Sequence, residues 1–232
     1  MGRDSLPLLA DVLTGKKLFT EFRTEEKLTV IQSAFDSGVA DNLYHHIRVN
    51  ELDPEDIPNF EELEQFAQAR YSQYLRRVNQ IKVIAQRFEQ AAIPLVFFKG
   101  FSVCHQVYPV PYLRSMDDVD LLIPKAYAKD GISILKEEGF VLKLPRLGYE
   151  HPLTWKYEHV FELYRNDLFV DLHTHLHDVR GIMQLSMEQY EWLFEQSIPV
   201  TVAADFQIYG MRPEIELLYV GVHALMHHFR EP

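Results

Sequence analysis

Apolar residues recur at intervals of three and four between residues 59 and 90, the spacing that places side chains on one face of an α-helix. The helix is expected to begin near Asn59, because Glu62 follows three residues later in a capping-box arrangement. Its basic residues, interpreted as its solvated side, are Arg70, Arg76, Arg77, Lys82 and Arg87. We therefore expect residues 1–90 to form a helical N-terminal region.

The pattern changes after residue 90, where short apolar runs replace the helical spacing. The segments IPLVFFKG (93–100) and DVDLLIP (118–124) each predict a buried strand that ends in a turn. Further elements are predicted as a helix at 127–138, strands at 140–144, 156–164 and 168–176, and a hairpin turn at 165–167. This alternation predicts a mixed α/β core over residues 91–180.

The region after residue 180 is expected to return to helix. Pro213 suits the first turn of a helix that continues through EIELLYVGVHALMHHF. Because this apolar helix reaches almost to the last residue, we expect the natural domain to continue and the 181–232 region to be truncated. The predicted fold is thus α+β, with a mixed sheet flanked by N-terminal and C-terminal helices.

The net charge, the cysteine count and the lengths of the apolar runs exclude or disfavour several classes of function. The formal net charge is −11, from 34 acidic and 23 basic side chains, which disfavours broad binding to nucleic acids. The single cysteine, Cys104, excludes an internal disulfide framework and argues against a cysteine-rich zinc site. Neither a secretory signal nor an apolar run of membrane-spanning length is present in the sequence, so we expect a cytoplasmic protein without a membrane partner.

The segment DVDLL carries two carboxylates at alternate positions. In a strand, Asp118 and Asp120 project from one face about 7 Å apart along the backbone, while Val119 and Leu121 face the other side. Divalent ions roughly 3.5–4 Å apart use such paired carboxylates for in-line phosphoryl chemistry. The alternative is a pair of solvated acids at the end of a strand.

The segment Lys99-Gly100-Phe101-Ser102 follows the first predicted strand. Glycine there permits close approach of a ligand, a helix N-terminus offers free N–H groups to a phosphate, and Ser102 and Lys99 add a hydroxyl and a cation. The alternative is an ordinary strand-ending turn with a surface lysine.

The segment from Asp171 to His177 alternates one acid with three histidines. Asp171 is interpreted as a third metal carboxylate and His173 as a group that orients the site. A second interpretation is the opening strand of a metal-dependent barrel hydrolase, although few residues follow for such a barrel. A third is that His175 and His177 are hydrogen-bonded histidines of a partly buried strand.

Together, Lys99-Gly100, Tyr108-Pro109, Arg114, the Asp118-x-Asp120 segment, Gly139-Phe140 and Asp171-x-His173 resemble one family over residues 93–230. It is the uncharacterised bacterial nucleotidyltransferase family of the DNA polymerase β-like superfamily. The resemblance implies a nucleotidyltransferase core in which Gly100 and Ser102 occupy the phosphate turn. It places Asp118 and Asp120 on the paired metal ligands and Asp171 on the third carboxylate. The sequence departs from the superfamily at Phe101, where a second small residue is usual.

The resulting hypothesis is an enzyme that transfers a nucleoside monophosphate from an NTP, such as ATP, to an acceptor hydroxyl. Two Mg²⁺ ions, or Mn²⁺ in their place, would be held by Asp118, Asp120 and Asp171, while Lys99, Gly100, Ser102 and Arg114 would bind the triphosphate. The acceptor is left open among a protein, a peptide, a small molecule and an RNA end. The alternative function is a non-catalytic nucleotide-binding or protein-binding module on the same fold.

Overall fold

The chain forms two compact units, Met1–Arg76 and Arg77–Pro232, in a computed structural model. The structure describes residues 5–114, 116–143, 148, 151, 154, 158–176 and 185–226. None of the helices within these ranges is both long and apolar enough to cross a membrane.

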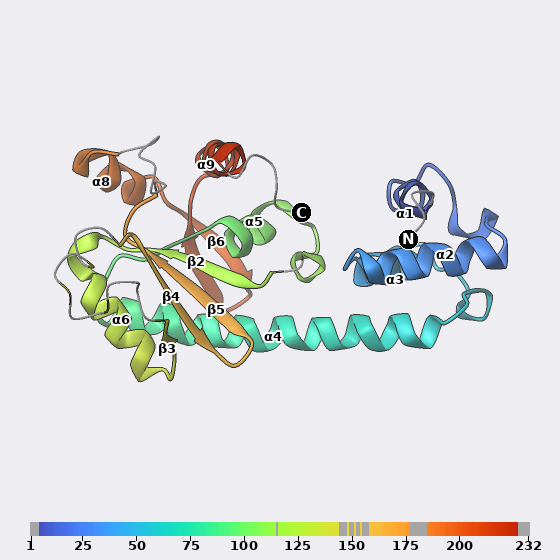
Figure 1. The fold of residues 1–232 in the computed structure, drawn as a ribbon, viewed down its shortest axis with the longest axis horizontal. Helices are drawn as coiled ribbons and strands as arrows, with labels where there is room; N and C mark the ends of the chain where they lie inside the picture. The colour runs from blue at the N-terminus through green and yellow to red at the C-terminus, as the bar shows by residue number, and fades with distance from the viewer. Residues whose placement is uncertain are drawn as a thin grey trace. The chain divides into compact units, whose positions relative to one another are not determined.

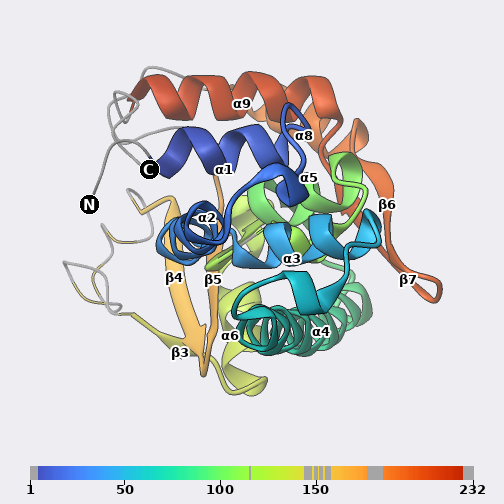
Figure 2. The same cartoon turned by 90° about the vertical axis from the view of Figure 1, so that its right-hand side faces the viewer.

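The first unit is built of helices (Figures 1 and 2). Its helices are α1 (Ser5–Leu13), α2 (Thr24–Asp36), α3 (Ala40–Val49) and the first half of α4 (Phe60–Gln90), with 3-10 turns at Phe19–Glu21 and Pro54–Asp56. Phe19, Leu43, Ile47 and Leu63 are almost fully buried in its core. The long helix predicted between residues 59 and 90 is confirmed as α4.

The second unit contains a mixed, seven-stranded sheet in the order β3-β4-β5-β2-β1-β7-β6 among the described residues. Its strands are β1 (Val96–Phe98), β2 (Asp118–Leu122), β3 (Val141–Leu142), β4 (Val160–Arg165), β5 (Leu168–His173), β6 (Ile198–Ala203) and β7 (Phe206–Gly210). Strands β4 and β5 form the predicted hairpin, whose turn contains Asn166 with a positive φ of 55°. The predicted α+β class with a mixed sheet is therefore confirmed.

Helices cover both faces of this sheet (Figures 1 and 2). They are the second half of α4, α5 (Lys99–Val107), α6 (Ala128–Glu137), α8 (Met187–Glu195) and α9 (Pro213–Met226), with 3-10 turns at Pro111–Leu113 and Lys125–Tyr127. Helices α8 and α9 pack through Tyr190 and Tyr219 against Phe98 and Leu122. On the opposite face α6 packs so closely that a Cβ atom at Gly131 would lie 2.8 Å from Ile123.

The prediction that residues 181–232 are helical is wrong for the segment between α8 and α9. Strands β6 and β7 form an antiparallel hairpin there, and Phe97 of β1 pairs with Gly210 of β7. Buried and exposed positions alternate around Val200 in the segment IPVTVA, since Val200 is buried and both its neighbours are exposed. The β-branched residues of this segment also favour a strand. The hairpin extends the sheet on the β1 side and places α9 beside α5.

Candidate active site

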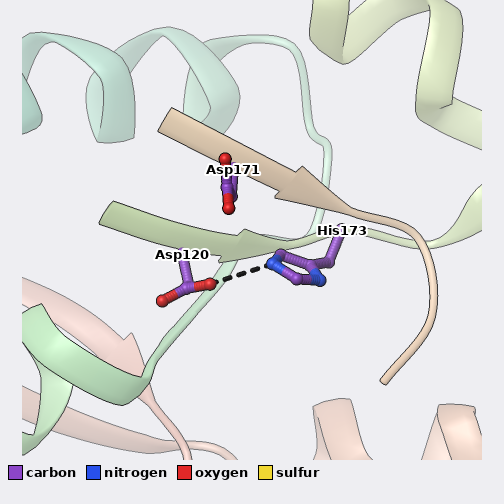
Figure 3. Close-up of side chains that lie close together, drawn as sticks. All are labelled: Asp120, Asp171 and His173. Atoms are coloured by element: carbon purple, nitrogen blue, oxygen red, sulfur yellow. Dashed lines mark hydrogen bonds and ion pairs between the residues drawn. The ribbon is translucent and has the colours of Figure 1, made fainter. Parts of the chain in front are cut away.

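The predicted carboxylates meet where β2 and β5 run parallel. Asp120 is paired in register with Asp171, and Asp118 with Phe169. Because alternate residues share a face, Asp118, Asp120, Asp171 and His173 all face the side of α5 and α9. Figure 3 shows Asp120, Asp171 and His173 close together. The cavity above them has a volume of about 540 Å³. It is lined by Lys99, Gly100, Arg114, Met116, Asp117, Asp118, Asp120, Glu162, Phe169 and Asp171.

Asp120 is the most strongly held of these carboxylates. Its Oδ1 atom lies 2.7 Å from Nζ of Lys99 and 2.9 Å from Nε2 of His173, and its side chain is only 2% exposed. Burial alone would raise its pKa, but the hydrogen bond from His173 and the charge of Lys99 lower it below the usual value. Asp120 is therefore ionised, and Oδ2 takes part in neither contact.

His173, at the end of β5, forms a buried hydrogen bond with Asp120. Burial lowers the pKa of His173, so the ring is neutral at pH 7. An ionised carboxylate only accepts hydrogen bonds, so the contact with Asp120 requires the proton to be on Nε2. The ring of Phe98 meets the imidazole edge-on, with centroids 4.8 Å apart.

Asp118 and Asp171 have raised pKa values. Burial raises the pKa of Asp171 to about 6, and the like charges of Asp120 and Asp118 add to this effect. Burial and Asp120 also raise the pKa of Asp118. One ligand atom each from Asp120, Asp171 and His173 lies within 4.8 Å of the others. This cluster of oxygen and nitrogen donors has the composition of a site for a divalent cation.

Lys99 and Gly100 begin α5 at the edge of the cavity formed by the end of β1, on the other side of β2 from Asp171. Lys99 has a positive φ of 51°, which turns the chain sharply from β1 into the helix. Burial tends to lower the pKa of Lys99, but the neighbouring Asp120 raises it above the usual value. A Cβ atom on Gly100 would lie 3.2 Å from a terminal nitrogen of Arg114, so the guanidinium group passes directly over this glycine.

Ser102 does not line the cavity, although the sequence analysis placed it with the phosphate-binding residues. It is fully buried, and its Oγ accepts a hydrogen bond of 2.7 Å from Nε2 of Gln106. Ser102 lies three residues after Lys99 on α5, and the helix turns its hydroxyl toward β7, where a Cβ on Gly210 would come within 2.5 Å.

Glu216 of α9 is a buried acid that the sequence analysis missed. Its Oε2 atom accepts a hydrogen bond of 3.0 Å from the backbone N–H of Lys99. Burial raises the pKa of Glu216 to about 7, against the opposing effects of the Lys99 amide and the Ser102 hydroxyl. This carboxyl group thus caps the N-terminus of α5 from a distant helix.

Arg77 was interpreted as part of the solvated side of α4, which is wrong. One terminal nitrogen donates to the carbonyl of Met116 and the other donates to the carbonyl of Asp167 at 2.9 Å. Met116 and Asp167 each precede a strand that carries site residues. Arg77 therefore connects the starts of β2 and β5.

Phe169 and Glu162 line the cavity and were also missed. Phe169 alternates with buried Leu168 and Val170 and shares a face with Asp171, and Glu162 pairs in register with Asp171. The alternation in LFVDLH could have predicted that Phe169 faces the cavity. The place of Glu162 could not be predicted in this way, because it depends on the pairing of β4 with β5.

The predicted row of histidines is shorter than expected. Strand β5 ends at His173, and the ring of His175 packs against those of His159 and Tyr190, at 4.5 Å and 5.0 Å between centroids. His177 lies outside the described residues. The described strands form an open sheet in the order given above, and not the barrel of the hydrolase interpretation.

Comparisons with known proteins identify the family of the chain. The sequence matches, over residues 24–232, the family described as uncharacterised nucleotidyltransferase. The chain belongs to this family. The resemblance to an uncharacterised nucleotidyltransferase family is thereby confirmed, and the chain is assigned to the nucleotidyltransferases. No curated protein matches it.

Two solved structures are similar to this nucleotidyltransferase. The antibiotic-resistance factor ANT(2'')-Ia is 16% identical, with 65% of this chain and 72% of that chain covered and a TM-score of 0.44. The lincosamide antibiotic adenylyltransferase LnuA, bound to lincomycin, is 16% identical, with 60% and 83% covered and a TM-score of 0.41.

Proposed function

We propose that this nucleotidyltransferase transfers a nucleoside monophosphate from an NTP to an acceptor hydroxyl, with Asp118, Asp120 and Asp171 as its metal-binding carboxylates. The parallel register that pairs Asp120 with Asp171 carries this proposal. It brings a third carboxylate beside the predicted pair, on the same face and in the same cavity.

The three carboxylates fit a site for Mg²⁺ or Mn²⁺. Carboxylate oxygens are the donors these ions prefer. The raised pKa of Asp171 reflects its burial and the repulsion from Asp120 and Asp118, and a bound cation would relieve this repulsion. Two such ions, when bound, would increase the reactivity of the attacking oxygen and stabilise the leaving pyrophosphate.

His173 is proposed to orient the metal-binding carboxylate of Asp120. It holds Oδ1 through a hydrogen bond of 2.9 Å, which fixes the direction of the other oxygen. Partners of this kind around metal ligands are often worth 10–100-fold, as an order of magnitude, in metal affinity.

The triphosphate is proposed to lie at the Lys99 and Gly100 end of the cavity. Gly100 presents backbone without a side chain, and Arg114 and Lys99 supply positive charge at the start of α5. Ser102, which faces Gln106, would act indirectly by supporting this turn.

In the proposed reaction the acceptor oxygen attacks the α-phosphorus in line with the departing group. The new O–P bond forms as the bond from the α-phosphorus to the bridging oxygen breaks. Pyrophosphate leaves with that electron pair, and the acceptor proton passes to the carboxylate of Asp171.

Calorimetry of ATP and GTP binding, with and without Mg²⁺, tests the proposal. Wild type is expected to bind one of these nucleotides only with Mg²⁺, and Asp118→Asn with Asp120→Asn is expected to lose that binding. Equal binding by folded wild type and variant would overturn the site assignment. Transfer of label from α-phosphate-labelled NTP to an acceptor would then separate an enzyme from a non-catalytic binding module.

A further inference from the structure

The cavity has two chemically different ends. Across the sheet, the strands follow the order β4-β5-β2-β1, so the residues that follow β1 and those of β4 lie on opposite sides of Asp118 and Asp120. Lys99, Gly100 and Arg114 form one end. Asp171, Phe169 and Glu162 form the other. With adjacent strands about 4.8 Å apart, Glu162 on β4 lies three strand spacings from β1, and Asp171 on β5 lies two.

In-line transfer of a nucleoside monophosphate places the leaving group at one end of the cavity and the acceptor at the other. The pyrophosphate leaves from one side of the α-phosphorus and the acceptor enters from the opposite side. The leaving group is highly anionic and therefore requires the end with Lys99 and Arg114. The acceptor then enters over β5 and β4, next to Asp171.

Two exposed aromatic side chains lie at this acceptor end. Phe169 is 51% exposed and Tyr164 is 43% exposed, and their ring centroids are 6.3 Å apart. On the other face of the same strands, Val170 and Leu163 are almost fully buried. Phe169 lines the cavity, and Tyr164 extends its apolar surface just outside the lining residues. A ring of the acceptor can cover this surface.

The charge at the acceptor end is negative. Glu162 and Asp171 are paired in register, and both line the cavity. Lys143 contacts Glu162 in an exposed ion pair, a type of contact that contributes little, and Lys143 is not among the lining residues. A cationic group on the acceptor would replace or share this contact, whereas an anionic acceptor would meet two carboxylates.

We propose that Phe169, Tyr164 and Glu162 form the acceptor subsite, and that the acceptor is a small hydroxyl compound bearing a ring and a protonated amine. The ring packs on Phe169 and Tyr164, the amine faces Glu162, and the hydroxyl oxygen beside Asp171 attacks the α-phosphorus. The inference rests on the proposed function, because it takes the direction of transfer from it.

The test uses tyramine as the probe, since it joins a ring, a hydroxyl group and a protonated amine. The full chain is loaded with Mg²⁺ and a non-hydrolysable ATP analogue, and probe binding is measured by saturation-transfer NMR. 4-Hydroxyphenylacetate replaces the amine by a carboxylate, and ethanolamine removes the ring. We expect tyramine to bind about tenfold more tightly than either, from the ring contact and the charge together.

Variants locate the binding. Phe169→Ala is expected to weaken tyramine binding about tenfold and to leave the affinity for the ATP analogue within about twofold of wild type. Tyr209→Ala is the matched control, because Tyr209 is 59% exposed on β7 and does not line this cavity. Glu162→Gln is expected to reduce the preference for tyramine over 4-hydroxyphenylacetate.

Several results would overturn the inference. They are equal tyramine binding by wild type and Phe169→Ala, no preference for the amine, no measurable tyramine binding, and a loss of ATP-analogue affinity in Phe169→Ala. The last result would assign the rings to the nucleotide base. Failure of the proposed function is a separate outcome, because wild type would then show no Mg²⁺-dependent binding of the ATP analogue.

Discussion

The carboxylate of Glu216 accepts a hydrogen bond of 3.0 Å from the backbone N–H of Lys99, a residue 117 positions earlier in the sequence. This contact joins α9 to the turn in which Lys99 has a positive φ and directs its ammonium group to Asp120. The C-terminal helix thereby supports the proposed phosphate-binding end of the cavity.

Stability should fall with rising pH because of Glu216. Its pKa rises from 4.5 in the unfolded chain to about 7 in the folded chain, so the folded state binds this proton more tightly. The contribution of Glu216 to the free energy of unfolding is therefore about 3 kcal/mol larger below about pH 4.5 than above pH 7. Glu216→Gln keeps an acceptor for Lys99 and should lose this dependence.

Urea unfolding at pH 5 and pH 8 measures the effect. The free energy of unfolding of Glu216→Gln is expected to increase relative to that of wild type as the pH rises. Glu191→Gln, which changes an exposed acid on α8, is the control and should keep the pH dependence of wild type. Parallel pH curves for wild type and Glu216→Gln would contradict the assigned pKa.

Removing one of the clustered charges should stabilise the protein in the absence of divalent ions. At pH 8, Asp171 is ionised although burial and the neighbouring carboxylates raise its pKa to about 6. Asp171→Asn should therefore raise the free energy of unfolding in EDTA by about 2 kcal/mol, after allowance for solvent at this partly exposed group.

The same substitution should have the opposite consequence when Mg²⁺ is added. Wild type is expected to gain thermal stability with Mg²⁺, whereas Asp171→Asn gains much less, because it has lost a ligand. Melting curves with EDTA and with Mg²⁺ check both halves of this prediction. A variant that melts below wild type in EDTA would show that repulsion among these carboxylates is unimportant.

His173 should affect metal affinity through Asp120. His173→Ala removes the donor to Oδ1 and is expected to weaken Mn²⁺ binding by roughly 10–100-fold. Gln in this position has an amide nitrogen close to where Nε2 lies, so His173→Gln should recover part of the loss. Electron paramagnetic resonance of free Mn²⁺ gives the affinities. Equal affinities for Ala and Gln variants would indicate a packing role, such as the contact with Phe98.

Local patterns predicted the carboxylate pair, whereas long-range pairing determined the rest of the site. Alternation within DVDLL is sufficient to put Asp118 and Asp120 on one face, because the period of a strand is a local property. The sequence analysis predicted a strand containing Asp171 after a hairpin turn at 165–167, but not the strand that pairs with it on the other side. In the structure it is the parallel pairing of β2 with β5 that places Asp171 beside Asp120.

Ser102, Glu216 and Arg77 show why the other site residues were misassigned or missed. The direction of Ser102 depends on where α5 begins, which a glycine-containing turn alone does not define. Arg77 lies on an amphipathic helix, and Glu216 lies in the first turn of an apolar one; at both places charged residues are usually solvated. Their partners are backbone groups of distant segments, and no local pattern identifies these.

Arg77 should determine how well the two carboxylate-bearing strands are aligned. Its two terminal nitrogens donate to the carbonyls of Met116 and Asp167, which lie just before β2 and β5. Arg77→Ala leaves both carbonyls without this donor and should cost about 1–3 kcal/mol in the free energy of unfolding. Because it loosens the register between Asp120 and Asp171, it should also weaken Mn²⁺ binding.

Two further variants distinguish this role from a general effect of charge. Arg77→Lys keeps the charge but has one nitrogen in place of the planar fork, so it should restore only part of the stability and metal affinity. Arg76→Ala removes an exposed neighbour on the same helix and should change neither by more than about 0.5 kcal/mol. Full recovery in Arg77→Lys would mean that charge, and not the bridging of the two carbonyls, is what the site requires.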